Sequence, residues 1–225
     1  MDALIAQLPP FDHYAQRWHY AHTNWLPFYW SGYEQTTRYT YVIDDLSDLD
    51  AVFAGFSPGK RKDIKKAERA VRIEFDISAR SFYDNHRMTL AQQGDKISYS
   101  FDVFQRLYER GYQYNAARTI AAFDAQDNLH AALFVVWDQN SAYDLISTID
   151  HHYRNSGAAS LLIREIIKDV AGKTKKFDFE GSMIESVEYS FRQFNTVQVP
   201  YFAISKTPSR FYAASKFMKS LLPGR

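Results

Sequence analysis

A polar turn at residues 154–159 has the residue types and the spacing of an anion site. Arg154, Gly157 and Ala159 stand in the order Arg-x-x-Gly-x-Ala, directly before an apolar helical repeat that runs from Leu161 to Val170. The first amides of a helix lack internal partners and carry the positive end of the helix dipole, and small residues let a ligand approach the backbone closely. Such a turn suits a pyrophosphate group.

Three stretches of the chain carry a family resemblance. Arg154-Asn-Ser-Gly-Ala-Ala159 resembles the acyl-CoA pyrophosphate loop of the GNAT acyltransferase superfamily, in which the loop joins the fourth strand to the next helix. Arg61-Lys-Asp-Ile-Lys-Lys-Ala-Glu-Arg69 and Phe177-Asp-Phe-Glu-Gly-Ser-Met183 resemble the FemAB-like branch of methicillin-resistance-type, peptidoglycan bridge-forming aminoacyltransferase relatives. The similarity runs from about Trp25 to Lys206.

The resemblance implies an α/β (α+β mixed sheet) structure with the GNAT acyl-CoA N-acyltransferase fold. It also implies acetyl-CoA or another acyl-CoA as co-substrate. The residues expected to bind it are Ile149, Asp150, Arg154, Asn155, Ser156, Gly157, Ala158 and Ala159.

Asp178 and Glu180 are the candidate bases. A strand over 176–180 would place Phe177 and Phe179 on one face and the two carboxylates on the other. In GNAT proteins this strand separates from the one that ends here at Asp150, and the gap admits pantetheine. An attacking amine must lose a proton, which either carboxylate could accept. We favour Glu180, because it lies nearest the C-terminal end of the strand. In the alternative, one carboxylate binds the basic helix or a backbone turn.

Other polar residues have weaker patterns. The acid that returns a proton to the departing thiolate is a tyrosine beyond the fifth strand in the families that this chain resembles. The candidates are Tyr153, Tyr189, Tyr201 and Tyr212, of which we select Tyr189. His151 and His152 are adjacent, so they point in different directions, and no third ligand is spaced nearby. We therefore expect no metal site.

A basic helix is predicted over residues 60–70. Its cations either form a solvated face or contact phosphates of tRNA, of a sugar-phosphate or lipid-phosphate acceptor, or of the CoA 3′-phosphate. The net charge of +1 argues against extensive RNA binding. A tRNA contact would use Lys60, Arg61, Lys62, Lys65 and Lys66.

The elements that position these residues follow from hydrophobic periodicity and turn signals. Three strands joined by short turns predict an antiparallel meander, and one crossover helix follows it. Strands are predicted at 36–43, 71–77, 117–123, 130–138, 142–149, 176–180 and 197–204, and further helices at about 80–92, 101–112, 185–194 and 209–222. Residues 1–56 form an aromatic-rich segment, which we interpret as a remnant of a second GNAT-like half, and residues 57–225 form the GNAT-like acyltransferase domain.

Composition narrows the class of protein further. The absence of cysteine excludes disulfides, thiolate metal ligands and a cysteine nucleophile. No apolar run approaches the roughly 20 residues of a transmembrane helix, and the N-terminus lacks the basic region of a signal peptide. We expect a soluble cytoplasmic protein.

The sequence thus predicts an N-acyltransferase that moves an acyl group from acyl-CoA to a primary amine, for example in an amino sugar or a cell-envelope precursor. One alternative is aminoacyl-tRNA-dependent transfer of the FemAB type. Another is a catalytically degenerate binding module with the GNAT fold. A free sheet edge would also allow a homodimer.

Overall fold

The computed structural model describes residues 1–221 and divides the chain into two compact units. The larger unit comprises Tyr41–Gln198, and the smaller unit combines residues 1–40 with residues 199 onward. This division differs from the predicted boundary after residue 56, because the smaller unit takes both ends of the chain. The interpretation of residues 1–56 as a remnant of a second half stays a prediction.

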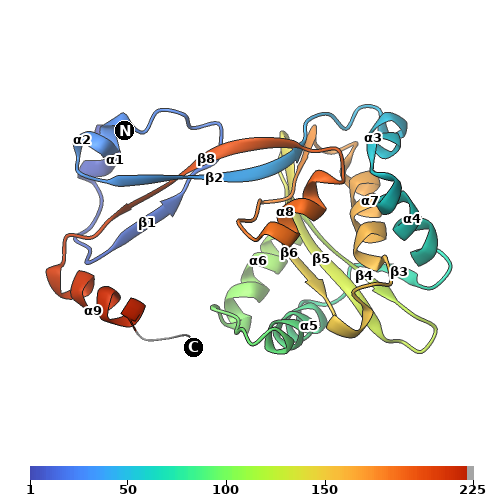
Figure 1. The fold of residues 1–225 in the computed structure, drawn as a ribbon. Coiled ribbons are helices and arrows are strands. Elements are labelled where there is room, and N and C mark those ends of the chain that lie inside the picture. Colours follow the sequence, from blue (N-terminus) through green and yellow to red (C-terminus); the bar gives the residue numbers. More distant parts are fainter. Residues whose placement is uncertain (222–225) are drawn as a thin grey trace. The chain divides into compact units, whose positions relative to one another are not determined.

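The larger unit contains most of the regular structure (Figure 1). Its helices are α3 (Leu49–Gly55), α4 (Pro58–Ala67), α5 (Ala79–Gln92), α6 (Phe101–Gln113), α7 (Ala158–Val170) and α8 (Glu185–Arg192), with a 3₁₀ turn, η1, at His151–Tyr153. Its strands are β3 (Arg72–Phe75), β4 (Ala117–Phe123), β5 (Leu129–Trp137), β6 (Ser141–Ile149) and β7 (Lys176–Asp178).

The strand topology confirms the predicted meander and crossover. β3, β4, β5 and β6 pair successively as antiparallel neighbours, and β6 pairs with β7 in parallel after the α7 crossover. The whole sheet is hydrogen-bonded in the order β1-β8-β2-β7-β6-β5-β4-β3. Two predicted strands were too long: β3 spans only Arg72–Phe75 of the predicted 71–77, and β7 ends at Asp178 and not at residue 180.

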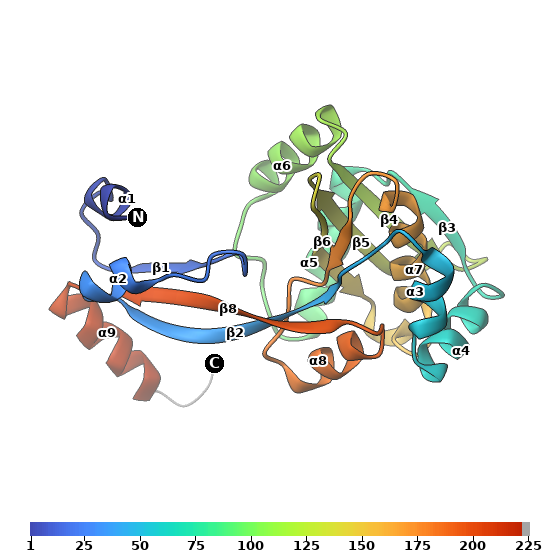
Figure 2. The same cartoon turned by 90° about the horizontal axis from the view of Figure 1, so that it is seen from above.

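Helices cover both faces of this part of the sheet, as Figure 2 shows for α4 and α7 on one side and α5 and α6 on the other. The first face contains a buried cluster that includes Leu162 and Ile166 of α7 and Ile64 of α4. The second contains Phe82 of α5 and Phe104 of α6, whose rings stack at 5.4 Å between centroids. Both faces of β4 and β5 are therefore buried.

Short polar side chains fix where four of the helices begin. Each accepts a hydrogen bond from a first-turn amide that has no partner inside the helix. The caps are Asp48 before α3, Ser57 before α4, Ser78 before α5 and Ser100 before α6, at 3.0–3.4 Å from the amide nitrogen. The predicted break at Ser57-Pro-Gly is thus the start of the basic helix.

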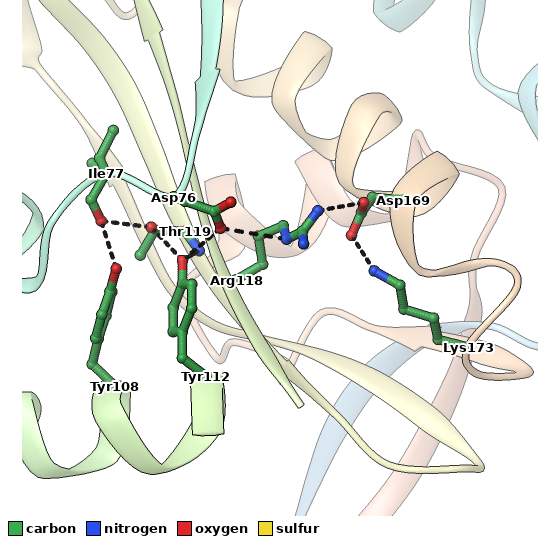
Figure 3. Close-up of polar contacts among 8 residues, drawn as sticks. All are labelled: Asp76, Ile77, Tyr108, Tyr112, Arg118, Thr119, Asp169 and Lys173. Carbon is green, nitrogen blue, oxygen red and sulfur yellow. Dashed lines mark hydrogen bonds and ion pairs between the residues drawn. The ribbon is translucent and has the colours of Figure 1, made fainter. Parts of the chain in front are cut away.

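A polar network crosses β4 and holds the helices of both faces (Figure 3). Arg118 Nη1 donates to Asp169 Oδ1 on α7 at 2.6 Å, and its Nε lies 3.5 Å from Asp76 Oδ1. On the other face, Tyr112 of α6 donates to the same Asp76 oxygen at 2.9 Å and accepts from the Thr119 amide. Neighbouring residues of one strand, Arg118 and Thr119, thereby link α7 to α6.

The smaller unit contains α1 (Asp2–Ala6), β1 (Tyr14–Arg17), α2 (Leu26–Trp30) and α9 (Arg210–Leu221). β2 (Glu34–Ile43) and β8 (Val197–Lys206) contribute residues to both units. Aromatic side chains around Trp18, Phe28 and Tyr33 form its core. The predicted last helix residue, Leu222, lies outside the described residues. None of the described helices combines the length and the apolar character needed to cross a membrane.

Candidate active site

β6 and β7 separate after the third residue of β6. Their parallel pairing consists of Ser141 with Lys176, Ala142 with Phe177 and Tyr143 with Asp178, whereas β6 continues to Ile149. Within the described residues, no strand pairs with the β7-facing edge of β6 beyond this point. An unpaired strand edge presents backbone donors and acceptors that a ligand can use.

A β-bulge lies at the point of separation. On the β5 side, Val135 pairs with Asp144 but Phe134 pairs with Ile146, so Leu145 is an extra residue in β6. A bulge leaves the extra residue out of the regular ladder and turns its backbone groups. Leu145 therefore has no partner on β5 in the strand register.

Asp144 is buried beside the bulge, with 6% of its surface exposed. Its Oδ2 accepts a hydrogen bond from Ser147 Oγ at 2.6 Å. Its Oδ1 has no hydrogen-bond partner in the described part of the chain. A buried acceptor without a partner is rare in proteins and points to a ligand.

Burial raises the pKa of the Asp144 carboxyl to about 7; the hydrogen bond from Ser147 opposes the rise, and the negative charge of Glu180 adds to it. A carboxyl with this pKa is partly ionised at neutral pH, which is the state that a general base needs. Perturbed carboxyls of this kind are concentrated at functional sites.

The two carboxylates predicted from the sequence have different surroundings. Asp178 is buried at the end of β7, and its Oδ1 accepts a hydrogen bond from the Glu180 amide at 2.8 Å. Glu180 is exposed and has a positive φ of 60°, followed by Gly181 at 69°. The chain therefore turns sharply after β7. The prediction that side chains alternate between the two faces of a strand through residue 180 was wrong. Asp178 supports this turn, while the charge of Glu180 acts on Asp144.

Sequence reasoning missed Asp144, although a signal was present. Aspartate is depleted in strands and is rarely buried without a partner. Asp144 interrupts an otherwise apolar stretch of a central strand, between Ala142 and Ile146. A lone carboxylate at such a position indicates a functional group.

Tyr189, the predicted acid, lies on α8 with 61% of its surface exposed. The better-enclosed tyrosine hydroxyl beside this helix belongs to Tyr41. Its oxygen donates to Glu188 Oε1 and accepts from Gln198 Nε2, both at 2.6 Å. Burial, followed by the hydrogen bond to Glu188, raises the pKa of Tyr41. The role of Tyr189 stays a prediction.

The predicted anion loop joins β6 to α7, and α5 holds its first part. Asp150 Oδ1 accepts hydrogen bonds from the His152 amide at 2.9 Å and from Gln92 Nε2 at 3.3 Å. The other side-chain atom of Gln92, Oε1, accepts from the His151 amide at 3.1 Å. Arg154 is exposed, and its Nε donates to the His151 carbonyl at 3.3 Å. Its guanidinium thus lies on the surface of the loop.

Gly157 lies where α4 approaches this loop. It has a φ of +82°, and a Cβ built there would lie 2.3 Å from the Asp63 carbonyl oxygen of α4. Lys66 of α4 also donates to the Asn155 carbonyl of the loop at 2.7 Å. Packing of α4 thus requires a glycine here whether or not a pyrophosphate binds.

The basic residues of α4 fall into two groups. Lys60 donates to Ser190 Oγ at 2.7 Å, and burial lowers its pKa; Arg61 donates to the Phe56 carbonyl at 2.6 Å. A second group faces a groove of about 700 Å³ and has no ion pair within the described residues. This second group is Lys62, Lys65, Lys66 and Arg69.

Comparison with known proteins decides the family. Residues 58–184, more than half of the chain, match the model of the acetyltransferase (GNAT) domain. The chain belongs to the GNAT acetyltransferase-domain family. Acyl transfer is accordingly its general reaction. No curated protein matches it in sequence.

Solved structures show the same GNAT fold at low sequence identity. FemX is 9% identical with a TM-score of 0.66, over 84% of this chain and 69% of FemX. L-PGS from Bacillus licheniformis is 11% identical with a TM-score of 0.57, over 89% of this chain and 70% of that protein. The C-terminal domain of a putative lysylphosphatidylglycerol synthetase from Agrobacterium fabrum is 10% identical with a TM-score of 0.57, over 89% and 69% of the two chains. The likeness confirms the predicted GNAT fold.

Proposed function

We propose that this GNAT protein transfers an acyl group from acyl-CoA to a primary amine, with Asp144 as the general base. One observation carries the proposal: a buried carboxyl with an unpartnered Oδ1 lies where β6 and β7 separate. The amine would belong to a small molecule, such as an amino sugar or a cell-envelope precursor.

The proposed chemistry requires one proton acceptor and one polarised carbonyl. Asp144 takes a proton from the amine as nitrogen attacks the thioester carbon. The Leu145 amide at the bulge stabilises the negative charge that develops on the carbonyl oxygen. The C–N bond forms, the C–S bond breaks, and the thiolate leaves with a proton, for which Tyr189 remains our candidate donor. Glu180 favours the protonated form of Asp144 and thereby tunes the base.

We infer that the donor pyrophosphate binds at the start of α7. The first-turn amides of α7 attract an anion there, although the Ala158 amide already donates to Ser156 Oγ at 3.2 Å, and Arg154 is exposed on the same loop. The test is calorimetric titration with acetyl-CoA. Wild type should bind, and Arg154→Ala should bind about tenfold more weakly, the loss of about 1.4 kcal/mol that one charge-assisted contact supplies. Arg106→Ala removes an exposed arginine of α6 and is the matched control. No acetyl-CoA binding by wild type would overturn the choice of donor.

The base is tested by thiol release from acetyl-CoA in the presence of candidate amines. Asp144→Asn keeps the shape of the side chain but cannot accept the proton, so kcat should fall about 10²- to 10⁴-fold. Acetyl-CoA affinity should stay unchanged. Asp95→Asn, which removes an exposed carboxylate, is the control. Wild-type kcat in Asp144→Asn would exclude Asp144 as the base.

A second candidate donor, aminoacyl-tRNA, is favoured by the α4 groove. Its cations without ion-pair partners adjoin the anion loop through the Lys66–Asn155 contact. Phosphate contacts make binding fall steeply with salt, so Lys62→Ala with Lys65→Ala should weaken tRNA binding and reduce its salt slope by about two. The charge-matched control is Lys96→Ala with Arg106→Ala. Salt-sensitive tRNA binding by a protein that does not bind acetyl-CoA would make this the leading function.

A further inference from the structure

The smaller unit has a recess on one face of its sheet. The recess measures about 330 Å³ and is formed by residues of β1, β2 and β8 and by the segment before β1. This volume is at the lower end of the range for small-molecule sites, roughly 300–1,000 Å³. Every lining residue belongs to the smaller unit.

The strand register explains why this face is hollow. Ala15 pairs with Ser205 and Arg17 pairs with Ala203, so these four side chains share one face of the sheet. Strands usually carry β-branched or aromatic residues, and two alanines and a serine leave the backbone uncovered. The floor of the recess is therefore open to a ligand.

Two arginines of the recess carry positive charges that form no ion pair with an acidic side chain of the described residues. Arg17 and Arg38 both line the recess, and neither forms an ion pair within the described residues. Among the described residues, no carboxylate lines the recess. His13 also lines the recess, and two contacts hold its side chain in place. Its Nδ1 lies 2.8 Å from Thr207 Oγ1, and its ring stacks on the ring of Tyr212 with 5.1 Å between centroids.

We propose that this recess binds a phosphomonoester group through Arg17 and Arg38. A guanidinium offers parallel N–H donors that match phosphate oxygens in pairs. A phosphomonoester carries a charge of about −1.5 to −2 at neutral pH, which balances two arginines, whereas a carboxylate balances one. The exposed floor leaves room for the organic part of the ligand. The phosphate would come from a soluble metabolite or from a lipid headgroup.

The experiment measures binding of inorganic phosphate and of acetate by calorimetry at constant ionic strength. Wild type should prefer phosphate. Arg17→Ala with Arg38→Ala should weaken phosphate binding at least tenfold, whereas the control Lys96→Ala with Arg106→Ala, which has the same net charge, should stay within twofold of wild type. An equal loss in both variants, or none in either, would overturn the proposal.

Two further measurements make the outcome decisive. Near-ultraviolet circular dichroism of the aromatic cluster reports whether the double alanine variant is folded. If it is not, the variant Arg17→Lys with Arg38→Lys is measured in its place. This variant keeps the positive charge but loses the paired N–H donors, so its phosphate affinity should still fall severalfold. Vesicles of phosphatidic acid in phosphatidylcholine distinguish the sources. Arginine-dependent binding to the vesicles indicates a headgroup, and arginine-dependent binding to free phosphate alone indicates a soluble ligand. Binding that is independent of the arginines in both assays refutes the site.

Discussion

The buried carboxyl of Asp144 makes protein stability depend on pH in a direction that can be calculated. Its pKa is raised from 3.8 to about 7 in the folded protein. Between these values the folded state holds a proton that the unfolded state has released. Stability from this group is therefore greatest below the unfolded pKa and is lost as the pH rises through the folded pKa.

The magnitude follows from the two pKa values. One pKa unit corresponds to about 1.36 kcal/mol, so raising the pH from 5 to 8 should remove about 2.5 kcal/mol of unfolding free energy from wild type through this one group. Asp144→Asn cannot titrate and should not show this loss. The difference between the two proteins isolates the group, because all other titrations cancel.

Urea unfolding at pH 5, 6, 7 and 8 measures this difference. The stability of Asp144→Asn relative to wild type should increase steadily from pH 5 to 7 and level off above pH 7. The control Asp95→Asn should give a nearly constant difference from wild type. Parallel stability curves for wild type and Asp144→Asn would refute the assignment of a raised pKa, and with it one of the two supports for Asp144 as the base.

Three other predictions test separate contacts. Glu180→Gln removes a charge that raises the Asp144 pKa, so the acidic limb of kcat/KM against pH should move to lower pH; an unchanged limb contradicts the coupling. Gly157→Ala should destabilise the protein by about 1–3 kcal/mol in thermal or urea unfolding, because the new Cβ clashes with α4 and the residue has a positive φ. In the control Gly172→Ala the new Cβ has no atom within 4 Å, so its stability should stay within about 0.5 kcal/mol of wild type. Arg118→Met should cost about 1–2 kcal/mol in urea unfolding, because Asp76 loses its cation and Asp169 keeps only Lys173. Wild-type stability would show that the network contributes nothing.

The parts of the fold that follow a regular period were predictable. The meander, the crossover helix α7 and helices α5 and α6 have strong hydrophobic repeats and clear turns, and their predicted bounds agree with the structure to within a few residues. The elements that were missed, α1, β1, α2 and α3, contain only four to seven residues each. Such lengths are too short for a hydrophobic period to be recognised, and α2 has a proline in its first turn.

The site was predictable only in part, because its chemistry depends on pairing between distant segments. Sequence spacing singled out residues 154–159 as an anion loop and Glu180 as a base, and both roles stay predictions. It could not reveal that β7 ends early, or that Leu145 forms a bulge against β5, since both facts depend on register. Asp144 is visible in the sequence as an aspartate within an apolar strand, but its burial and its unpartnered Oδ1 are known only from the structure.

The composition of the smaller unit has a consequence for biosynthesis. Tyr14 of β1 stands opposite Lys206 of β8, so the two partners are translated almost a whole chain apart. The larger unit, residues 41–198, is continuous and contains its own cores. Domains fold as they emerge from the ribosome, and distant pairings form late. The pairing of β1 with β8 therefore cannot form until β8 has been translated, after every residue of the larger unit.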